Sequence, residues 1–174
     1  MWAIYEVENA ENVFEYDGKA KMTTYMEVVY RVNNCRGICH FNTIWGNLDL
    51  IDLPQMAEMY SAATGWETSG NDLKRMGERQ LNLEKAFNLP FTRFDRKDDL
   101  PTLRDLSEPI PTGPGAGWKM DFDWYNRMLD EYYEIHGWDR RTSFPTREAL
   151  VRLGLAPVAD DLEKIGQLGQ SSRP

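Results

Sequence analysis

Helical spacing of apolar residues is the feature that most constrains the fold of this chain. In the segment 19–33 the apolar side chains fall on one face of a helix: Met22, Tyr25, Met26, Val29 and Val32. The same periodicity predicts helices at 54–64, 69–89, about 121–136 and 146–153, and a weaker one at 158–168. In the helix 69–89 the apolar positions are Leu73, Met76, Leu83 and Phe87. The pattern predicts a mainly α fold.

Proline and glycine mark where these helices begin and end. Pro54 suits a first helical turn, and Gly65 stops the helix that it starts. Ser69 is a suitable N-cap, with Asp72 three residues later in a capping-box arrangement. Residues 90–118 hold five prolines and three glycines, so we expect a long connection that wraps over the surface.

We therefore expect one irregular helical domain with long loops, over residues 19–169. Residues 1–18 carry a short alternating segment and are expected to form an extended arm or a short strand. The tail 170–174 is expected to be flexible. No internal repeat is evident, and a chain of 174 residues is within the usual range for a single domain.

Charge and composition narrow the classes of partner. The formal charge is −8 and no stripe rich in Lys or Arg offsets it, which argues against nucleic-acid binding. No run of residues is long and apolar enough to span a bilayer. The N-terminus lacks a basic region followed by an apolar stretch, and two cysteines make no disulfide framework, so we expect a cytoplasmic protein. The aromatic content of 12% suits a thick core or a buried interface.

Both cysteines lie in one short segment, Asn33–Phe41, directly after the first predicted helix. Gly37, between the two thiols, allows the backbone to approach a bulky ligand closely, and a thiolate there can ligate a metal. From residue types alone, two small buried hydrophobic side chains are a more common explanation of Cys35 and Cys39 than a metal site. It lacks the second pair that is typical of zinc sites, and His40 is adjacent rather than opposed to a thiol.

The other polar candidates are better explained as structural. His136, near the end of a helix, is expected to be a helix-dipole partner or a surface residue. The charged segment 95–99 is expected to be a solvated loop. The segment 113–117 lacks the ending of a phosphate loop, so we expect a turn. We name no catalytic acid or base in this chain.

The order of several segments resembles a known family. The segments are Asn34-x-x-Gly37-Ile38-Cys39-x-Phe41, Tyr60–Trp66, Gly77–Asn88, Asp95–Pro101, Gly113-Pro114, Leu129–Tyr133 with Gly137–Asp139, and Pro145–Glu148. In this order they resemble the C-terminal helical part of the tungsten-containing aldehyde ferredoxin oxidoreductase family. That family includes tungsten-dependent benzoyl-CoA reductase subunits. The resemblance covers about residues 19–156.

The resemblance implies a cofactor site at the first of these segments. The family works with a tungsten bis-pyranopterin and a nearby four-iron four-sulfur (4Fe-4S) cluster. Carried over, Cys39 is the fourth cluster ligand, and Gly37 and Ile38 lie against a pterin, Ile38 through its main chain. Asn34 stands where the family usually has Asp, so it accepts hydrogen bonds from the pterin without charge assistance. Cys35 has no counterpart in the motif and is expected to be structural.

The resemblance also implies a partner. The family's other three cluster cysteines lie upstream in a Cys-x₂-Cys-x₃-Cys run that this sequence does not contain. The implied function is that of a C-terminal portion or split subunit, inactive alone, which completes the site against the N-terminal part or another subunit. Ferredoxin accepts the electrons of such a complex. Two alternatives remain: a non-catalytic helical interaction module or truncated remnant, and a thiol redox protein that uses Cys35 and Cys39.

Overall fold

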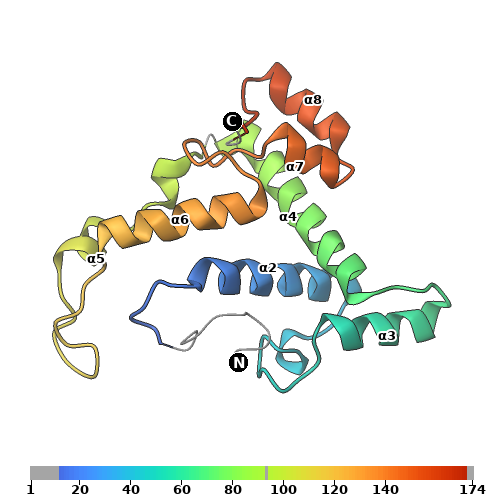
Figure 1. The fold of residues 1–174 in the computed structure, drawn as a ribbon, viewed down its shortest axis with the longest axis horizontal. Coiled ribbons are helices and arrows are strands. Elements are labelled where there is room, and N and C mark those ends of the chain that lie inside the picture. Colours follow the sequence, from blue (N-terminus) through green and yellow to red (C-terminus); the bar gives the residue numbers. More distant parts are fainter. Residues whose placement is uncertain (1–11, 93, 172–174) are drawn as a thin grey trace.

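The computed structural model describes residues 12–92 and 94–171, and within them the protein is mainly helical, as predicted (Figure 1). The described helices, two of them short 3₁₀ helices (η), are α2 (Lys19–Arg36), η1 (His40–Asn42), α3 (Leu53–Thr64), α4 (Gly70–Thr92), η2 (Arg96–Asp99), α5 (Leu103–Ser107), α6 (Phe122–His136), α7 (Arg147–Arg152) and α8 (Ala156–Lys164). The same ranges contain isolated β-bridges but no β-strand. The alternating segment expected near the N-terminus, Trp2–Val7, lies outside the described residues.

The predicted helix boundaries agree with the observed caps. The first helix, α2, ends at Gly37, whose positive φ of 68° lets its N–H reach carbonyls of the last turn. Pro54 lies in the first turn of α3, and the N-cap is Asp52, which forms a capping box with Gln55. At the start of α4, the Ser69 N–H donates to the Asp72 side chain at 2.9 Å, as the capping-box pattern predicts.

A long central helix, α4, organises the packing. In Figure 1 it runs diagonally, with α3 at one end and α7 and α8 at the other, while α2 and α6 lie side by side to its left. The helices α2 and α4 cross at Gly77, where a Cβ atom would lie 2.8 Å from the carbonyl oxygen of Val28. Glycine at this position therefore permits the close approach of the two backbones.

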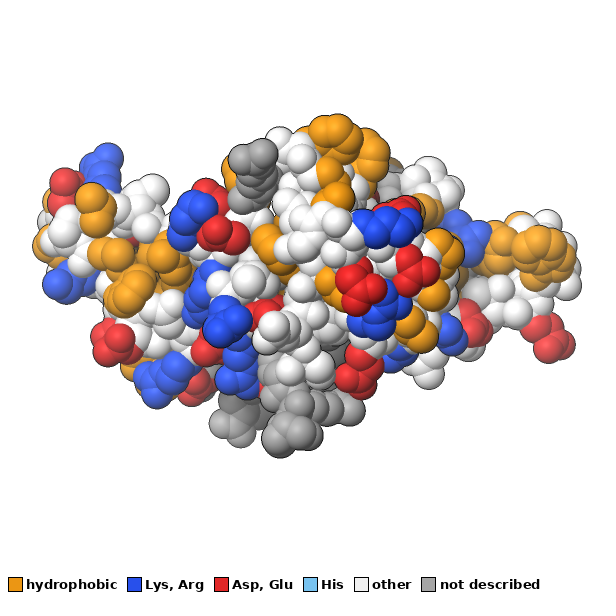
Figure 2. Space-filling model, turned by 90° about the horizontal axis from the view of Figure 1, so that it is seen from above, with side chains coloured by type: hydrophobic (Ala, Val, Ile, Leu, Met, Phe, Trp, Pro, Cys, Tyr) orange, Lys and Arg blue, Asp and Glu red, His pale blue; other side chains and the backbone are white. Residues whose placement is uncertain are grey.

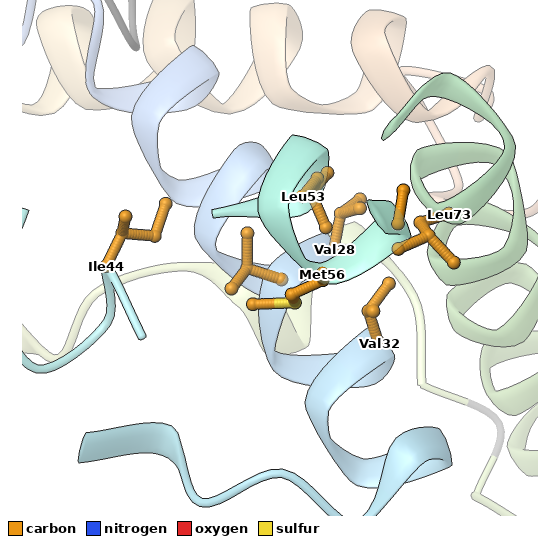
Figure 3. Packing of buried hydrophobic residues seen from close by; sticks show 8 residues of the cluster. Val28, Val32, Ile44, Leu53, Met56 and Leu73 are labelled. Atoms are coloured by element: carbon orange, nitrogen blue, oxygen red, sulfur yellow. The ribbon is translucent and has the colours of Figure 1, made fainter. Parts of the chain in front are cut away.

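Three clusters of buried apolar side chains hold the helices together. The first joins α2, α3 and α4 (Figure 3), the second joins α4, α7 and α8, and the third joins α4, α6 and Trp138. Each cluster takes at least one residue from α4: Leu73 in the first, Ala86 and Leu89 in the second, and Leu81 in the third. The core is thus distributed along one helix.

Two expectations about the second half of the chain are corrected. The segment expected as a long connection, 90–118, contains the end of α4, which continues through Pro90 to Thr92, as well as η2 and α5. The C-terminal helix is α8, Ala156–Lys164, rather than 158–168. It ends earlier because Gly166, at φ 70°, turns the chain so that the N–H of Gln167 bonds to the carbonyl of Leu162.

Many large apolar side chains remain at the surface. Figure 2 shows them on one face of the molecule, in separate patches between charged side chains. Those that are used below are Tyr30, Phe41, Trp45, Leu83, Phe87, Phe91 and Phe94. Single exposed apolar residues are normal, whereas contiguous patches indicate an interaction site.

Candidate functional site

The residues predicted from the resemblance lie together at the C-terminal end of α2, where Asn34 is in the last turn, and in the turn that follows it. Gly37 reverses the chain, and the N–H of Ile38 donates to the carbonyl of Asn33 at 3.0 Å. Ile38 is half-buried against the first apolar cluster, which anchors the turn. Cys39 follows in an extended conformation as the N-cap of η1. Asn34, Gly37 and Cys39 are exposed, so this stretch, which we call the Cys39 turn (residues 34–41), presents them to the outside.

A hydrogen-bonded chain of side chains fixes Asn34. The buried Asn33 donates from Nδ2 to His40 Nδ1 at 3.0 Å and to Thr43 Oγ1 at 3.1 Å. Because His40 Nδ1 accepts, its proton is on Nε2, which donates to Asn34 Oδ1 at 3.2 Å. His40 therefore engages one lone pair of the Asn34 amide oxygen and holds that side chain in place. Residue types alone did not reveal this role of His40.

Aromatic side chains border the Cys39 turn. The ring of His40 stacks on Tyr30, with centroids 4.2 Å apart and planes 4° from parallel. Phe41 meets Trp45 edge to face at 5.7 Å. Tyr30, Phe41 and Trp45, which we call the aromatic rim, are all exposed. Tyr30 and Trp45 also line a groove of about 400 Å³ along α2, together with Met22 and Met26.

Both thiols are exposed and free. The expectation of two small buried side chains is therefore wrong. Cys35 lies in the last turn of α2 and donates its S–H to Gln80 Oε1 on α4 at 2.6 Å. Cys39 lies beyond Gly37, at the surface of the turn. A thiol in this position is accessible to a metal ligand sphere that is completed from outside the chain.

The described residues offer no complete metal site of their own. Within residues 12–92 and 94–171 no group of three or more His, Cys, Asp and Glu side chains is placed to hold a metal ion. A four-iron four-sulfur cluster takes four protein ligands. Cys39 fits such a cluster as a single ligand, with the remaining thiolates coming from elsewhere.

His136, which we expected to be a helix-dipole partner or a surface residue, is instead packed between helices. His136 is only 3% exposed, and its Nε2 lies 3.3 Å from Glu27 Oε2 of α2. Tyr132 donates to the same carboxylate at 3.0 Å. Burial, and then the charge of Glu27, raises the pKa of Tyr132 far above its ordinary value. This network joins α2 to α6 and serves their packing.

The charged segment 95–99 is a docked element rather than a solvated loop. The guanidinium of Arg96 donates to Asp130 Oδ1 at 2.6 Å and to the Arg140 carbonyl at 2.7 Å. Tyr133 donates to Asp99 Oδ2 at 2.6 Å, and burial with this carboxylate raises the pKa of Tyr133. These bonds fasten η2 to α6.

None of the described helices is long and apolar enough to cross a membrane.

Comparison with known proteins places this helical architecture. The fold matches a chain of the active-site complex BamBC of benzoyl coenzyme A reductase in complex with 1,5-dienoyl-CoA, with a TM-score of 0.71 and 25% identity over 92% of this chain and 22% of that chain. The model of a protein family described as aldehyde ferredoxin oxidoreductase, domains 2 & 3, matches residues 1–155. The chain belongs to this family.

Curated relatives in the family are named tungsten-containing aldehyde ferredoxin oxidoreductase. The protein of Pyrococcus horikoshii is 34% identical over 80% of this chain and 21% of its own length. That of Thermococcus kodakarensis is 33% identical over 80% of this chain and 22% of its own length. The chain therefore spans about a fifth of the length of these relatives.

Proposed function

We propose that this chain completes the cofactor site of a tungstopterin iron–sulfur oxidoreductase, against the N-terminal part of that enzyme or a separate subunit. The observation that carries the proposal is Cys39, a free and exposed thiol on a surface turn that is anchored by the Ile38–Asn33 backbone hydrogen bond and by the packing of Ile38. We infer tungsten as the metal because the relatives are named tungsten-containing enzymes. The reaction is aldehyde oxidation with ferredoxin as electron acceptor, or related acyl-CoA redox chemistry, as the benzoyl-CoA reductase match suggests.

In this proposal the residues of the Cys39 turn have separate roles. When bound, the 4Fe-4S cluster transfers electrons and the tungsten bis-pyranopterin supplies the redox chemistry. The Cys39 thiolate ligates one iron. Gly37, around whose absent Cβ there is no atom within 4 Å, leaves room for a flat ligand against the backbone, and the main chain of Ile38 continues that wall. Asn34 contributes a polar group at its edge.

Asn34 acts differently from the aspartate that the family usually has at this position. A carboxylate offers only acceptors, whereas the Asn34 amide oxygen is already paired with His40. The Asn34 oxygen keeps a second lone pair and its NH₂ group adds two donors, so this side chain can both accept from and donate to a ligand. This chain accordingly holds the pterin edge with a weaker and partly reversed hydrogen-bond pattern.

The proposal includes the organisation of the chain and its surroundings. Residues 19–169 form the cofactor-completing domain, and most of the expected N-terminal arm or short strand (1–18) and of the C-terminal tail (170–174) lies outside the described residues. The cytoplasm suits it, because reducing conditions keep the exposed Cys35 and Cys39 thiols free. The proposal assigns no catalytic acid or base to the described residues.

A cysteine substitution in the natively purified complex tests the proposal. We expect Cys39→Ser to remove or shift the low-temperature electron paramagnetic resonance signal of the reduced cluster and to lower the iron content. Cys35→Ser, the matched control at an exposed thiol on the same helix end, should leave both unchanged. Unaltered iron and spectrum in the Cys39→Ser complex contradict the proposal, as does a stoichiometric 4Fe-4S cluster on the isolated chain after anaerobic reconstitution.

One observation favours a second function, that of a non-catalytic helical interaction module. The Asn34 amide is engaged inside the chain by His40, so the turn has lost the charged acceptor of the family pattern. A module of this kind needs the helical scaffold and its apolar surface but no cofactor. Under this alternative the native complex contains neither iron nor tungsten above background, and Cys39→Ser changes nothing.

A further inference from the structure

The apolar face of α4 is covered along only half of its length. Leu73 is buried and Met76 packs partly against the cluster formed with α2 and α3. Continuing along the same face, Leu83, Phe87 and Phe91 are 43%, 67% and 75% exposed. The periodic pattern that predicted one buried face thus changes from core to surface in the middle of the helix.

The uncovered half is not simply a frayed helix end. On its other sides, Ala86 and Leu89 pack into the cluster with α7 and α8, so the backbone there is firmly held. Phe87 and Phe91 contact each other with ring centroids 5.4 Å apart, and Phe94, two residues after the end of the helix, is also exposed. We call Leu83, Phe87, Phe91 and Phe94 the α4 stripe.

A series of side-chain contacts connects the α4 stripe with the Cys39 turn. Cys35 donates to Gln80, and Gln80 donates to Glu84 at 3.0 Å. Glu84 pairs with Arg31 at 3.0 Å, and the Arg31 guanidinium lies over the ring of Tyr30 in the aromatic rim. Gln80 and Glu84 are on the same side of α4 as the stripe, because positions three and four apart share a helix face. One surface therefore carries the turn, a polar bridge and the stripe.

The length of the relatives indicates what covers this surface. About four fifths of each longer chain lies outside the match, both in the tungsten-containing relatives and in the benzoyl coenzyme A reductase chain. Phenylalanine is enriched in the buried centres of interfaces and is rarely clustered on an isolated surface. We propose that the α4 stripe is a docking surface for the pterin-carrying part of the oxidoreductase, which contacts the stripe and the Cys39 turn together. This inference rests on the proposed function.

Footprinting of side chains tests whether the stripe is covered. In the natively purified complex we expect hydroxyl-radical oxidation of Phe87 and Phe91, read by mass spectrometry, to fall at least about fivefold relative to the isolated chain. Val151, half exposed on α7, is the control and should be oxidised equally in both samples. Equal oxidation of Phe87 and Phe91 in complex and isolated chain overturns the inference.

Substitutions test whether the stripe contributes to binding. The double variant Phe87→Ser/Phe91→Ser should weaken association with the pterin-carrying polypeptide about 30-fold or more, the factor typical of central aromatic contacts. Val151→Ser should leave the affinity unchanged, and circular dichroism confirms that both variants fold. An isolated chain that sediments as a dimer and is dissociated by the double variant would identify a second copy as the occupant instead, which overturns the inference.

The two proposals fail separately. Cys39→Ser should alter the cluster spectrum with little effect on affinity, and the double stripe variant should alter affinity but not the spectrum of complex formed at saturating concentration. A complex with the expected cluster whose affinity is insensitive to the double variant refutes only the docking surface. A native protein that purifies without any pterin-carrying polypeptide refutes both.

Discussion

The hydrogen bond between α4 and the loop after α6 gives a sharp test of how the core is assembled. Asn82 is 1% exposed and its Oδ1 accepts from the indole N–H of Trp138 at 2.8 Å. Replacing Asn82 by Leu keeps the number and branching of the side-chain heavy atoms and leaves that buried N–H without a partner. An unsatisfied buried donor costs about 1–3 kcal/mol, which in a chain of this size lowers Tm by roughly 2–4 °C per kcal/mol.

A double-mutant cycle separates this bond from general packing loss. Trp138→Phe removes the donor and also loses the ring contacts with His136 and Lys85, so its cost exceeds that of Asn82→Leu. In the double variant neither partner is left unsatisfied. Its free energy of unfolding should therefore fall by about 1–3 kcal/mol less than the sum of the single variants.

Urea unfolding followed by circular dichroism measures all four proteins. Asn88→Leu, at an exposed position of the same helix, is the control, and it should change the unfolding free energy by no more than about 0.5 kcal/mol. Additivity of the two single variants within about 0.5 kcal/mol would refute the reasoning, because it would mean that the two side chains do not share a bond.

Two further predictions concern the charged side chains of Arg96 and Lys85. Arg96→Lys should lower the free energy of unfolding, measured in urea, by about 1–2 kcal/mol, because one ammonium cannot replace a guanidinium that bonds to Asp130, Asn126 and the Arg140 carbonyl. The control Arg104→Lys, in an exposed ion pair, should lower it by less than about 0.5 kcal/mol. Equal losses in the two variants would refute the argument. Burial lowers the pKa of Lys85 below its ordinary 10.5, with nearby carboxylates opposing the shift. The unfolded chain then binds more protons than the folded one in the window below 10.5, so stability should rise with pH there relative to Lys85→Met, and parallel pH profiles contradict this.

Local sequence signals were sufficient to predict most helix boundaries. Gly37 and Gly65 end α2 and α3 in the left-handed conformation that glycine favours, and Ser69 and Thr146 begin α4 and α7. These signals work because a cap satisfies backbone groups within a few residues of itself. The extension of α4 through Pro90 was missed, since packing of the neighbouring turn overrides the local preference.

Long-range packing explains the predictions that failed. The environment of His136 depends on Glu27, which is distant in sequence and comes close only when α2 and α6 lie side by side. Arg96 and Asp130 are likewise distant in sequence and form their ion pair only in the folded chain. Without that contact, the segment 95–99 was predicted to be a solvated loop. Helical periodicity likewise marked Phe87 as an apolar position without indicating whether another element of this chain covers it.

At the candidate site, too, the motif residues could be identified from the sequence, whereas their hydrogen-bond partners could not. Asn34, Gly37, Ile38 and Cys39 were identified from a family resemblance, and the structure brings them together in one turn. Their roles as ligands stay predictions. The part played by His40 was not visible in the sequence, because it follows from a buried amide on one side and an exposed amide on the other.

The participation of one helix in all three apolar clusters also bears on how the protein loses its structure. No cluster can open without exposing part of α4, and loss of α4 removes residues from every cluster at once. Melting of any one region is therefore coupled to the others, and the described helices should denature in a single cooperative step rather than as independent subunits of structure.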